Sequence, residues 1–316
     1  MKFDPAREAI RKIDQHCPLY KYTTLQAAKA IIENSSLKLS IPQAFNDPFD
    51  ILLEEALGAE IEDFLRDFMP AFFELVCGDL DYSLLRPGPM RDKIILINSG
   101  LRNLSTKQLA EHRREFMSEP PETIWSVPSL RATNEQVVRI IRSMNSNEGI
   151  FCSSANKDSL LMWSHYADHH RGIVLELRPD IEKDSALLAS RPVRYSNERP
   201  LLYRSARDFI EKSLFMSIED SARAILEPLI YTKSPAWAYE AEYRLAIPRF
   251  VPLGRSAEYL TIYPRELGAI YFGCRMTATE RSELKQLAQS FNPDIRFHRG
   301  VLAKREYALD WIADDE

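Results

Sequence analysis

Residues 19–41 read LYKYTTLQAAKAIIENSSLKLSI, and this stretch predicts a strand, a helix and a second strand in succession. Its first six residues favour a strand, since aromatic and β-branched side chains are common in strands. Thr23 or Thr24 can cap the helix, because a Thr hydroxyl accepts an orphan N–H of the first turn. Apolar residues then recur at helical spacing up to Asn34, a residue that tolerates the left-handed conformation common at helix ends. Alternation over Leu37–Ile41 predicts the second strand.

Strand and helix patterns return after residue 149 without a regular βαβ rhythm, which favours the α+β class over a doubly wound sheet. Strands are expected near 150–154, 172–177, 191–195, 240–247, 269–272 and 295–298, with helices over 160–166, 209–232 and 279–290. Residues 54–148 differ in having mainly helical periodicity, as in 54–77 and 135–144. A further amphipathic helix is expected over residues 1–15.

We therefore predict a single domain over residues 1–316. Its α+β core covers about 17–53 and 149–311, and a mostly helical insertion covers about 54–148.

Composition points to a globular protein of the cytoplasm. The chain has 316 residues, 45% of them hydrophobic, and a formal net charge of −5, which gives no global attraction to nucleic acid or anionic lipid. No stretch resembles a signal peptide or a membrane span, so no membrane partner is expected. The four cysteines are isolated, which suits a reducing compartment. The GxGxxG, GxxxxGK[ST], HExxH and GxSxG signatures are absent.

Two clusters near the N-terminus contain candidate binding residues. Tyr20 and Tyr22 share one face of the expected strand, where their aromatic rings either belong to the core or line a binding site. The segment from Ser40 through Asn46 to Asp50 is dense in turn-forming polar residues, and it suits either a structural turn or a binding loop.

A third cluster, Trp163–Arg171, contains three histidines. His165 and His169 stand at i and i+4, so one helical face could present both imidazoles to a metal ion. Alternatively, His169 and Arg171 simply complement the helix dipole at a polar helix end. Three ligands must converge to hold a metal, so we expect none.

The fourth cluster, Trp237–Arg244, contains paired carboxylates. In a strand, Glu240, Glu242 and Arg244 would project from one face, with Arg244 holding Glu242 ionised. Either this is a solvated strand face, or the carboxylates perform acid–base and oxocarbenium chemistry, which we favour.

These clusters make the chain resemble the bacterial domain-of-unknown-function family DUF2971. The matching segments are LYKYTTLQAAKAIIENSSLKLSIPQAFNDPFD, FCSSANKDSLLMWSHYADHHRGIVLEL, VRYSNERP, YTKSPAWAYEAEYRL and LGAIYFGCRM. They occur in the family's order, outside the helical insertion.

A more distant resemblance is to the ADP-ribosyltransferase fold, a split α+β sheet. That fold begins with a strand such as LYH-x-T, continues with a helix and a second strand, and ends with a strand bearing E-x-E. Here Leu19–Thr23 and Glu240-Ala-Glu242 stand in that order, with Lys21 where the motif has His or Arg.

The ADP-ribosyltransferase resemblance implies an enzyme that uses NAD as a substrate and modifies a macromolecule, whether RNA, DNA or protein. Glu242 would then stabilise the oxocarbenium ion, and Glu240 would orient or deprotonate the incoming nucleophile. The resemblance also suggests roles in NAD binding. A hydroxyl of Tyr20 or Tyr22, or else His165, would hold a ribose; rings of Tyr22, Tyr166 or Trp237 would sandwich nicotinamide; and Ser40, Asn46 and Arg171 would bind ribose and pyrophosphate.

Such an enzyme would often be a toxin or defence effector, with an antitoxin or regulatory partner. Two alternatives remain open at this level. One is a metal-dependent hydrolase or nuclease that uses His165, Asp168 and His169 with a carboxylate from Glu240 or Glu242. The other is a non-catalytic module that binds a nucleotide or a partner protein.

Overall fold

A computed structural model describes residues 17–51, 61–118, 139, 143, 148–201, 203–248 and 258–314 of the 316-residue chain. The predicted helices over 1–15 and 135–144 lie mainly outside these residues. The chain divides into two compact units. The first comprises residues 1–50, 146–197 and 231–316, and the second comprises 51–145 and 198–230. The prediction of a single domain stays a prediction.

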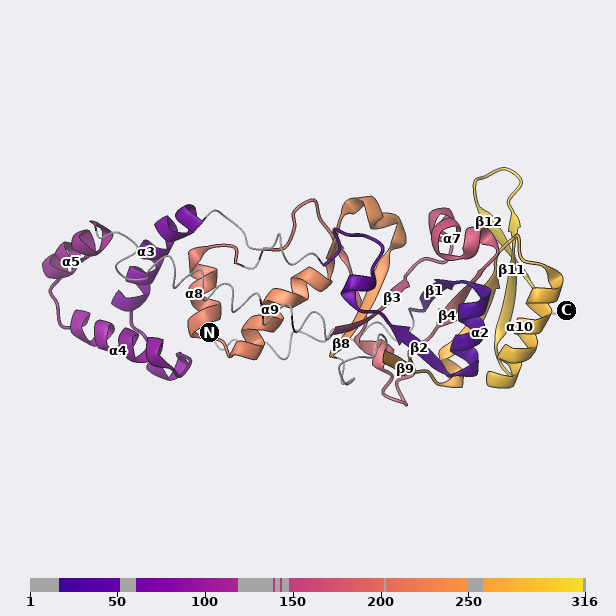
Figure 1. The fold of residues 1–316 in the computed structure, drawn as a ribbon, viewed down its shortest axis with the longest axis horizontal. Helices are drawn as coiled ribbons and strands as arrows, with labels where there is room; N and C mark the ends of the chain where they lie inside the picture. Colours follow the sequence, from indigo (N-terminus) through magenta and orange to yellow (C-terminus); the bar gives the residue numbers. More distant parts are fainter. Residues whose placement is uncertain are drawn as a thin grey trace. The chain divides into compact units, whose positions relative to one another are not determined.

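The first unit is built on an eight-stranded mixed sheet with the order β12-β11-β10-β4-β1-β3-β8-β5 (Figure 1). In chain order its strands are β1 (Leu19–Thr23), β3 (Glu148–Ser154), β4 (Ile173–Leu177), β5 (Arg191–Pro192), β8 (Glu242–Pro248), β10 (Leu267–Phe272), β11 (Arg296–Leu302) and β12 (Leu309–Ala313). Only β10 and β11 pair in parallel; the other neighbours are antiparallel. Together with the helices below, this sheet confirms the predicted α+β class.

Two small sheets accompany the large one among the described residues of this unit. One pairs β2 (Ser36–Leu39) with β9 (Glu258–Thr261), and the other pairs β6 (Arg194–Tyr195) with β7 (Thr232–Lys233). A single bridge between Ser40 and Ile150 ties the end of β2 to β3. That bridge brings the segment after β2 to the middle of the large sheet.

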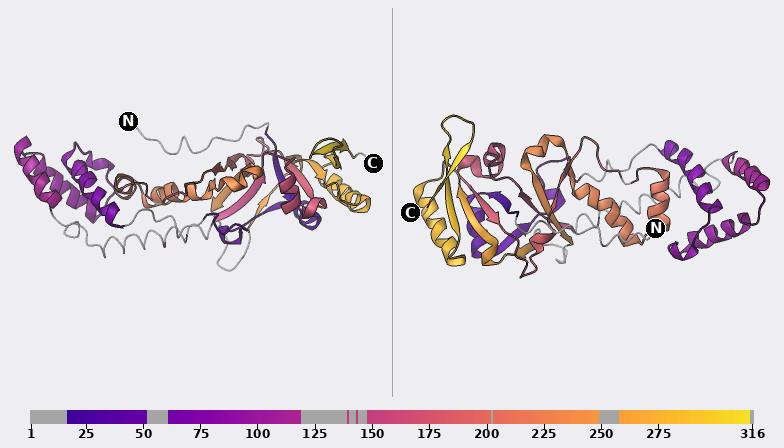
Figure 2. Two further views of the ribbon diagram at one scale, coloured as in Figure 1. Left: turned by 90° about the horizontal axis from the view of Figure 1, so that it is seen from above. Right: turned by 180° about the vertical axis from the view of Figure 1, so that it is seen from behind.

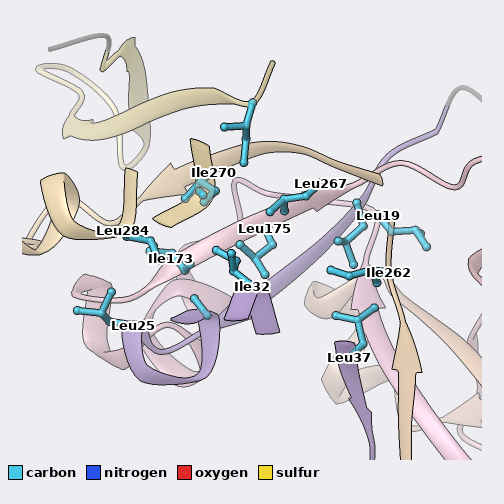
Figure 3. Close-up of a cluster of buried hydrophobic side chains, with 14 of the residues drawn as sticks. Leu19, Leu25, Ile32, Leu37, Ile173, Leu175, Ile262, Leu267, Ile270 and Leu284 are labelled. Carbon is cyan, nitrogen blue, oxygen red and sulfur yellow. The ribbon is translucent and has the colours of Figure 1, made fainter. Parts of the chain in front are cut away.

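Helices α2 (Leu25–Glu33) and α10 (Ala278–Phe291) cover one face of the sheet. Figure 3 shows Leu25 and Ile32 of α2 beside Ile173 of β4 and Leu284 of α10, within one apolar cluster. The central strand β4 is buried along its whole length, because its odd positions enter this cluster and its even positions face the opposite side. Figure 2 shows the ribbon of this sheet and its helices from above and from behind.

The opposite face is covered by helix α7 (Leu160–Tyr166). Met162 and the fully buried Trp163 pack there against Tyr22, Val174 and Tyr271. The Tyr22 and Trp163 rings meet edge to face at 5.5 Å. This is the face on which Tyr20 and Tyr22 lie, because the paired strands place residues in register on the same side.

The local sequence signals at helix α2 act as expected, with one correction. Thr24 is the N-cap, and its hydroxyl accepts a hydrogen bond from the Ala27 N–H. Asn34 is the C-cap, but its φ is −95°, so the predicted left-handed residue was wrong. Ser35 instead takes φ +48°, one position further on.

The second unit is helical in its described residues, apart from loops. It contains α3 (Ile61–Cys77), α4 (Pro89–Leu101), α5 (Thr106–Ser118), α8 (Ala206–Leu214) and α9 (Ile218–Ile230), with a 3₁₀ turn η3 (Tyr82–Leu84). Stacked Phe68 and Phe72 of α3 form its centre with Phe209 of α8. The single helix predicted over 209–232 was wrong, because residues 215–217 separate α8 from α9.

Within the described residues, no helix has both the length and the apolar character needed to cross a membrane.

Candidate functional site

The sheet face under α7 carries a pocket of about 290 Å³ within the first unit. Its walls combine aromatic rings, hydroxyl and amide groups, and charged side chains. They are formed by Tyr20, Lys21, Tyr22, Ser40, Ala44, Phe45, Asn46, Asp50, Cys152, Ser153, Met162, Tyr166, Lys233, Glu240 and Glu242. The pocket therefore contains residues from all four clusters found in the sequence, and Tyr166 is the residue from the histidine cluster.

The segment after β2 forms one wall of this pocket. Pro42 begins a short 3₁₀ turn, η1 (Pro42–Ala44), and Asp47 then accepts a hydrogen bond from the Phe49 N–H. This turn chemistry, which the sequence predicts, directs Phe45, Asn46 and Asp50 to the pocket.

Glu240 and Glu242 come from different elements. Glu240 ends the 3₁₀ helix η7 (Pro235–Glu240), Ala241 is left-handed with φ +43°, and Glu242 begins β8. The prediction that both carboxylates lie on one strand was therefore wrong. The Ser154 hydroxyl holds the bend by donating to the Glu240 carbonyl at 2.6 Å.

Lys233 nevertheless brings the two carboxylates together. Its Nζ lies 2.6 Å from Glu240 Oε2, 3.0 Å from Glu242 Oε2 and 3.7 Å from Asp50 Oδ2. Arg244 completes the set: Nε donates to Glu242 Oε1 at 2.8 Å, and Nη1 and Nη2 grip both oxygens of Asp50 at 3.0 and 2.5 Å. We call Asp50, Lys233, Glu240, Glu242 and Arg244 the buried charge cluster.

The buried charge cluster holds three carboxylates and two cations, so its formal charge is −1 when every member is ionised. None of these side chains is more than 6% exposed. Burial would raise the pKa of Glu242, but Arg244 and Lys233 outweigh it and lower that pKa to about 2. Burial likewise opposes a charge on Lys233, yet the carboxylates around it raise its pKa. Lys233 therefore stays protonated and does not act as an amine nucleophile.

Tyr166 links the buried charge cluster to the pocket wall formed by the segment after β2. Its hydroxyl donates to Glu240 Oε1 at 2.7 Å and accepts from Asn46 Nδ2 at 3.2 Å. Burial, followed by the Glu240 carboxylate, raises the Tyr166 pKa, so the phenol stays protonated. The pocket thus has an acidic corner, formed by Glu240 and the ionised Glu242, with hydroxyl and amide groups beside it.

Three predicted site residues do not line the pocket. The Trp237 ring lies 4.9 Å from Lys233 Nζ and so supports the cluster from behind. His165 Nδ1 is 3.2 Å from the Tyr239 hydroxyl. Arg171 is exposed, and its charge acts on Glu280 at the start of α10. The other predicted residues, Tyr20, Tyr22, Ser40, Asn46, Tyr166, Glu240 and Glu242, are all in the lining.

Sequence patterns missed two members of the buried charge cluster. Asp50 lies at the end of the turn segment, 194 residues from Arg244, and no local spacing signals that pairing. The 3₁₀ helix η7 lies between Lys233 and Glu242. Neither the two-residue period of a strand nor the 3.6-residue period of an α-helix therefore predicts that Lys233 meets Glu240. The density of charged residues over 233–244 was the available signal.

The histidine cluster lacks the helical pairing that was considered for a metal site. Helix α7 ends at Tyr166, and His169 has φ +52°, so His165 and His169 do not share a helical face as predicted. His170 stacks on Trp163, and its Nε2 is 3.2 Å from the Ser164 hydroxyl. No group of three or more His, Cys, Asp or Glu side chains suited to a metal occurs among the described residues.

The depressed pKa of Glu242 predicts an acid-dependent loss of stability. A Glu pKa lowered from 4.5 to about 2 stabilises the folded state above pH 4.5, and this contribution disappears as the pH falls toward 2. Urea unfolding of wild type and Glu242→Gln should therefore give a free-energy difference that shrinks between pH 5 and pH 2. Asp50 acts in the opposite direction: burial raises its pKa and the Glu242 charge adds to that shift, so Asp50 reduces the pH dependence of the difference without reversing it. A difference that is constant with pH would contradict the ion pairing described.

Fold and pocket together define an α+β protein whose mixed sheet carries a pocket walled by buried carboxylates that are paired with buried cations. Residues 162–245 match the model of a family described as Protein of unknown function (DUF2971). The matched range runs from α7 into β8 and includes Tyr166, Lys233, Glu240, Glu242 and Arg244. The comparisons with curated proteins and with solved structures gave no significant match. The predicted resemblance to DUF2971 is thereby supported over these residues.

Proposed function

We propose that the protein is a mono-ADP-ribosyltransferase that cleaves NAD and transfers ADP-ribose to a macromolecule. The observation that carries this proposal is the acidic corner of the pocket, where Glu240 and Glu242 meet with a formal cluster charge of −1. A fixed negative charge favours a bound cation, and the nicotinamide ring of NAD is cationic. The same charge stabilises the oxocarbenium ion that forms when the glycosidic bond breaks.

The reaction would proceed in two balanced parts. The bond between nicotinamide nitrogen and ribose C1′ breaks, and its electron pair leaves with neutral nicotinamide. The acceptor nucleophile then bonds to C1′ and loses its proton to Glu240, while Glu242 stabilises the ribosyl cation. Lys233 and Arg244 hold Glu242 ionised throughout this sequence, because they lower its pKa to about 2.

The other pocket residues suit the remainder of such a ligand. Tyr20, Tyr22 and Tyr166 offer rings for nicotinamide or hydroxyls for ribose, and Ser40 and Asn46 offer hydrogen bonds. Lys21 lines the pocket and its Nζ donates to the Cys152 carbonyl at 2.9 Å. Lys21 stands where the ADP-ribosyltransferase motif has His or Arg, so it takes the role of a fixed cation in the proposal. Arg171 and Trp237 have no direct role in it.

The test is NAD binding and nicotinamide release by the purified protein, with RNA, DNA and protein from cells supplied as acceptors. We expect NAD to bind and nicotinamide to be released, with label from the adenylate half transferred to one acceptor class. Binding without release under any acceptor would favour the non-catalytic nucleotide-binding module. If the protein neither binds NAD nor releases nicotinamide, the proposal is overturned. The pocket would then serve another ligand. A role as a toxin or defence effector, with an antitoxin partner, is an expectation that depends on the identity of the acceptor.

A further inference from the structure

A second charged cluster lies on the sheet face that carries the pocket. Its centre is Glu176 of β4, a carboxylate only 2% exposed. Glu176 Oε1 accepts from Arg178 Nε at 2.7 Å and from Arg296 Nη2 at 3.0 Å, and Oε2 accepts from the Tyr271 hydroxyl at 2.9 Å. One buried carboxylate thus holds two guanidinium groups side by side. We call Arg178 and Arg296 the arginine pair.

The arginine pair is built to present positive charge to the solvent. Each side chain is 53% exposed, although both are fixed to the same oxygen. Two guanidinium groups so close repel each other, and one carboxylate compensates only half of their charge. Gly268 leaves room for this contact: a Cβ there would lie 3.0 Å from Arg178 Nε and 3.2 Å from Glu176 Oε1, so a side chain at this position would crowd the pair. A fixed fork of exposed N–H donors with excess positive charge suits a phosphate group.

Tyr20 connects the arginine pair to the pocket. It is in register with Glu176 across β1 and β4, and its ring lies 6.2 Å from that of Tyr271. Tyr20 also lines the pocket. A ligand that binds the arginine pair can therefore extend along the same face to the acidic corner.

Aromatic rings accompany the cations on this face. Lys157 Nζ lies 5.4 Å from the Tyr271 ring centroid and 5.3 Å from that of Trp311. Lys157 also bonds both oxygens of Asp158 at 2.7 and 2.9 Å, and the Trp311 Nε1–H donates to the same carboxylate at 2.7 Å. Asp158 therefore compensates the charge of Lys157, and the excess positive charge of this face comes from the arginine pair. The His298 ring stacks on Tyr271 at 4.8 Å. Both His298 and Trp311 are partly exposed. Cations interleaved with partly exposed rings are typical of surfaces that bind single-stranded nucleic acid, where phosphates meet guanidinium groups and bases stack on rings.

We propose that this face binds a short single-stranded polynucleotide, with phosphates on the arginine pair and one base or ribose directed past Tyr20 into the pocket. The surface would supply the acceptor for the proposed ADP-ribosyl transfer, and only that role rests on the proposed function. Few phosphate contacts are involved, which agrees with a chain of net charge −5.

The probe is a labelled single-stranded oligonucleotide of roughly ten nucleotides, prepared as RNA and as DNA, titrated by anisotropy at several salt concentrations. Arg178→Ala with Arg296→Ala is expected to weaken binding roughly tenfold at low salt. The slope of log K against log salt should fall by about 1.4, since each lost contact to a single strand contributes about 0.7. NAD binding should change less than about twofold, because neither arginine lines the pocket.

Two further variants distinguish a loss of binding from a loss of the folded structure. Gly268→Val keeps both arginines but displaces Arg178, and it should also weaken binding. Arg178→Met with Arg296→Met and Glu176→Gln removes the buried carboxylate that would otherwise be left unpaired. The matched control is Lys38→Ala with Arg265→Ala, which removes the same charge from two exposed positions of this unit and should leave binding nearly unchanged.

Other results would overturn the proposal. Failure of the wild type to bind either oligonucleotide is one such result. A polyglutamate peptide that binds as tightly, with the same dependence on the arginine pair, is another and would indicate an acidic protein partner. Loss of NAD binding with oligonucleotide binding unchanged would assign the arginine pair to the pyrophosphate of the dinucleotide. If oligonucleotides bind but NAD is never cleaved, the proposed function fails while the polynucleotide surface stands.

Discussion

Replacing Glu242 by glutamine is expected to lower nicotinamide release from NAD by about 10²–10³-fold. The substitution keeps the shape of the side chain but removes the negative charge that would stabilise the ribosyl cation. The affinity for NAD should change far less, because the charge develops fully only in the transition state. Nicotinamide release under single-turnover conditions, together with NAD affinity by calorimetry, checks both expectations.

Two further variants, Glu240→Gln and Glu266→Gln, are the comparisons for Glu242→Gln. In Glu240→Gln, transfer to the acceptor should fall more than nicotinamide release in water, if Glu240 takes the acceptor's proton. Glu266 is as deeply buried as Glu242, at 1% exposure, but it accepts from Ser185 and from the Tyr263 N–H outside the pocket. Glu266→Gln should therefore retain activity. Equal activity of wild type and Glu242→Gln would contradict the proposed chemistry.

Replacing Arg244 by methionine is expected to lower the free energy of unfolding by about 3–5 kcal/mol. Arg244 is fully buried and bonds both Asp50 and Glu242, so its loss leaves three buried carboxylates with Lys233 alone. Breaking one side of a buried ion pair costs this much because the remaining charges are uncompensated. Urea unfolding at pH 7 measures the change.

Two comparisons separate charge from packing in that variant. Arg265→Met, at a side chain that is 82% exposed, should change stability by less than about 0.5 kcal/mol. Asp50→Asn in the Arg244→Met background should recover part of the loss, since it removes one unpaired carboxylate; the double-mutant cycle gives the coupling. A loss below about 1 kcal/mol for Arg244→Met would mean that the carboxylates do not bear charge when buried.

Much of the fold was predictable because its signals are local. The strand, helix and strand at 19–41, the buried strand β4 and the capped helix α10 each follow from periodicity and capping within a few residues. The short edge strands β9 and β12 were not predicted. Strand β12 is partly exposed at every position except Leu309, so its pattern lacks a clear buried face.

The site was predictable in its residue types but not in its geometry. Alternation placed Glu240 and Glu242 on one strand, whereas a left-handed Ala241 separates them. That conformation is rare for a residue with a Cβ, and no propensity rule predicts it. Lys233 and Asp50 reach the carboxylates through tertiary folding, so the ionisation state of Glu242 could be argued only in part, from Arg244.

The central place of β1 has a consequence for how the chain is made. Its hydrogen-bonded neighbours β3 and β4 follow only after a long interval, as Tyr22 and its partner Asn156 are 134 residues apart. At about 5–20 residues per second, a ribosome needs roughly 7–27 s to synthesise that interval. During this time both edges of a nascent β1 are unpaired, and such edges pair with other chains. Yield of soluble protein should therefore depend on elongation rate and on chaperones that shield the first fifty residues until the sheet can close around them.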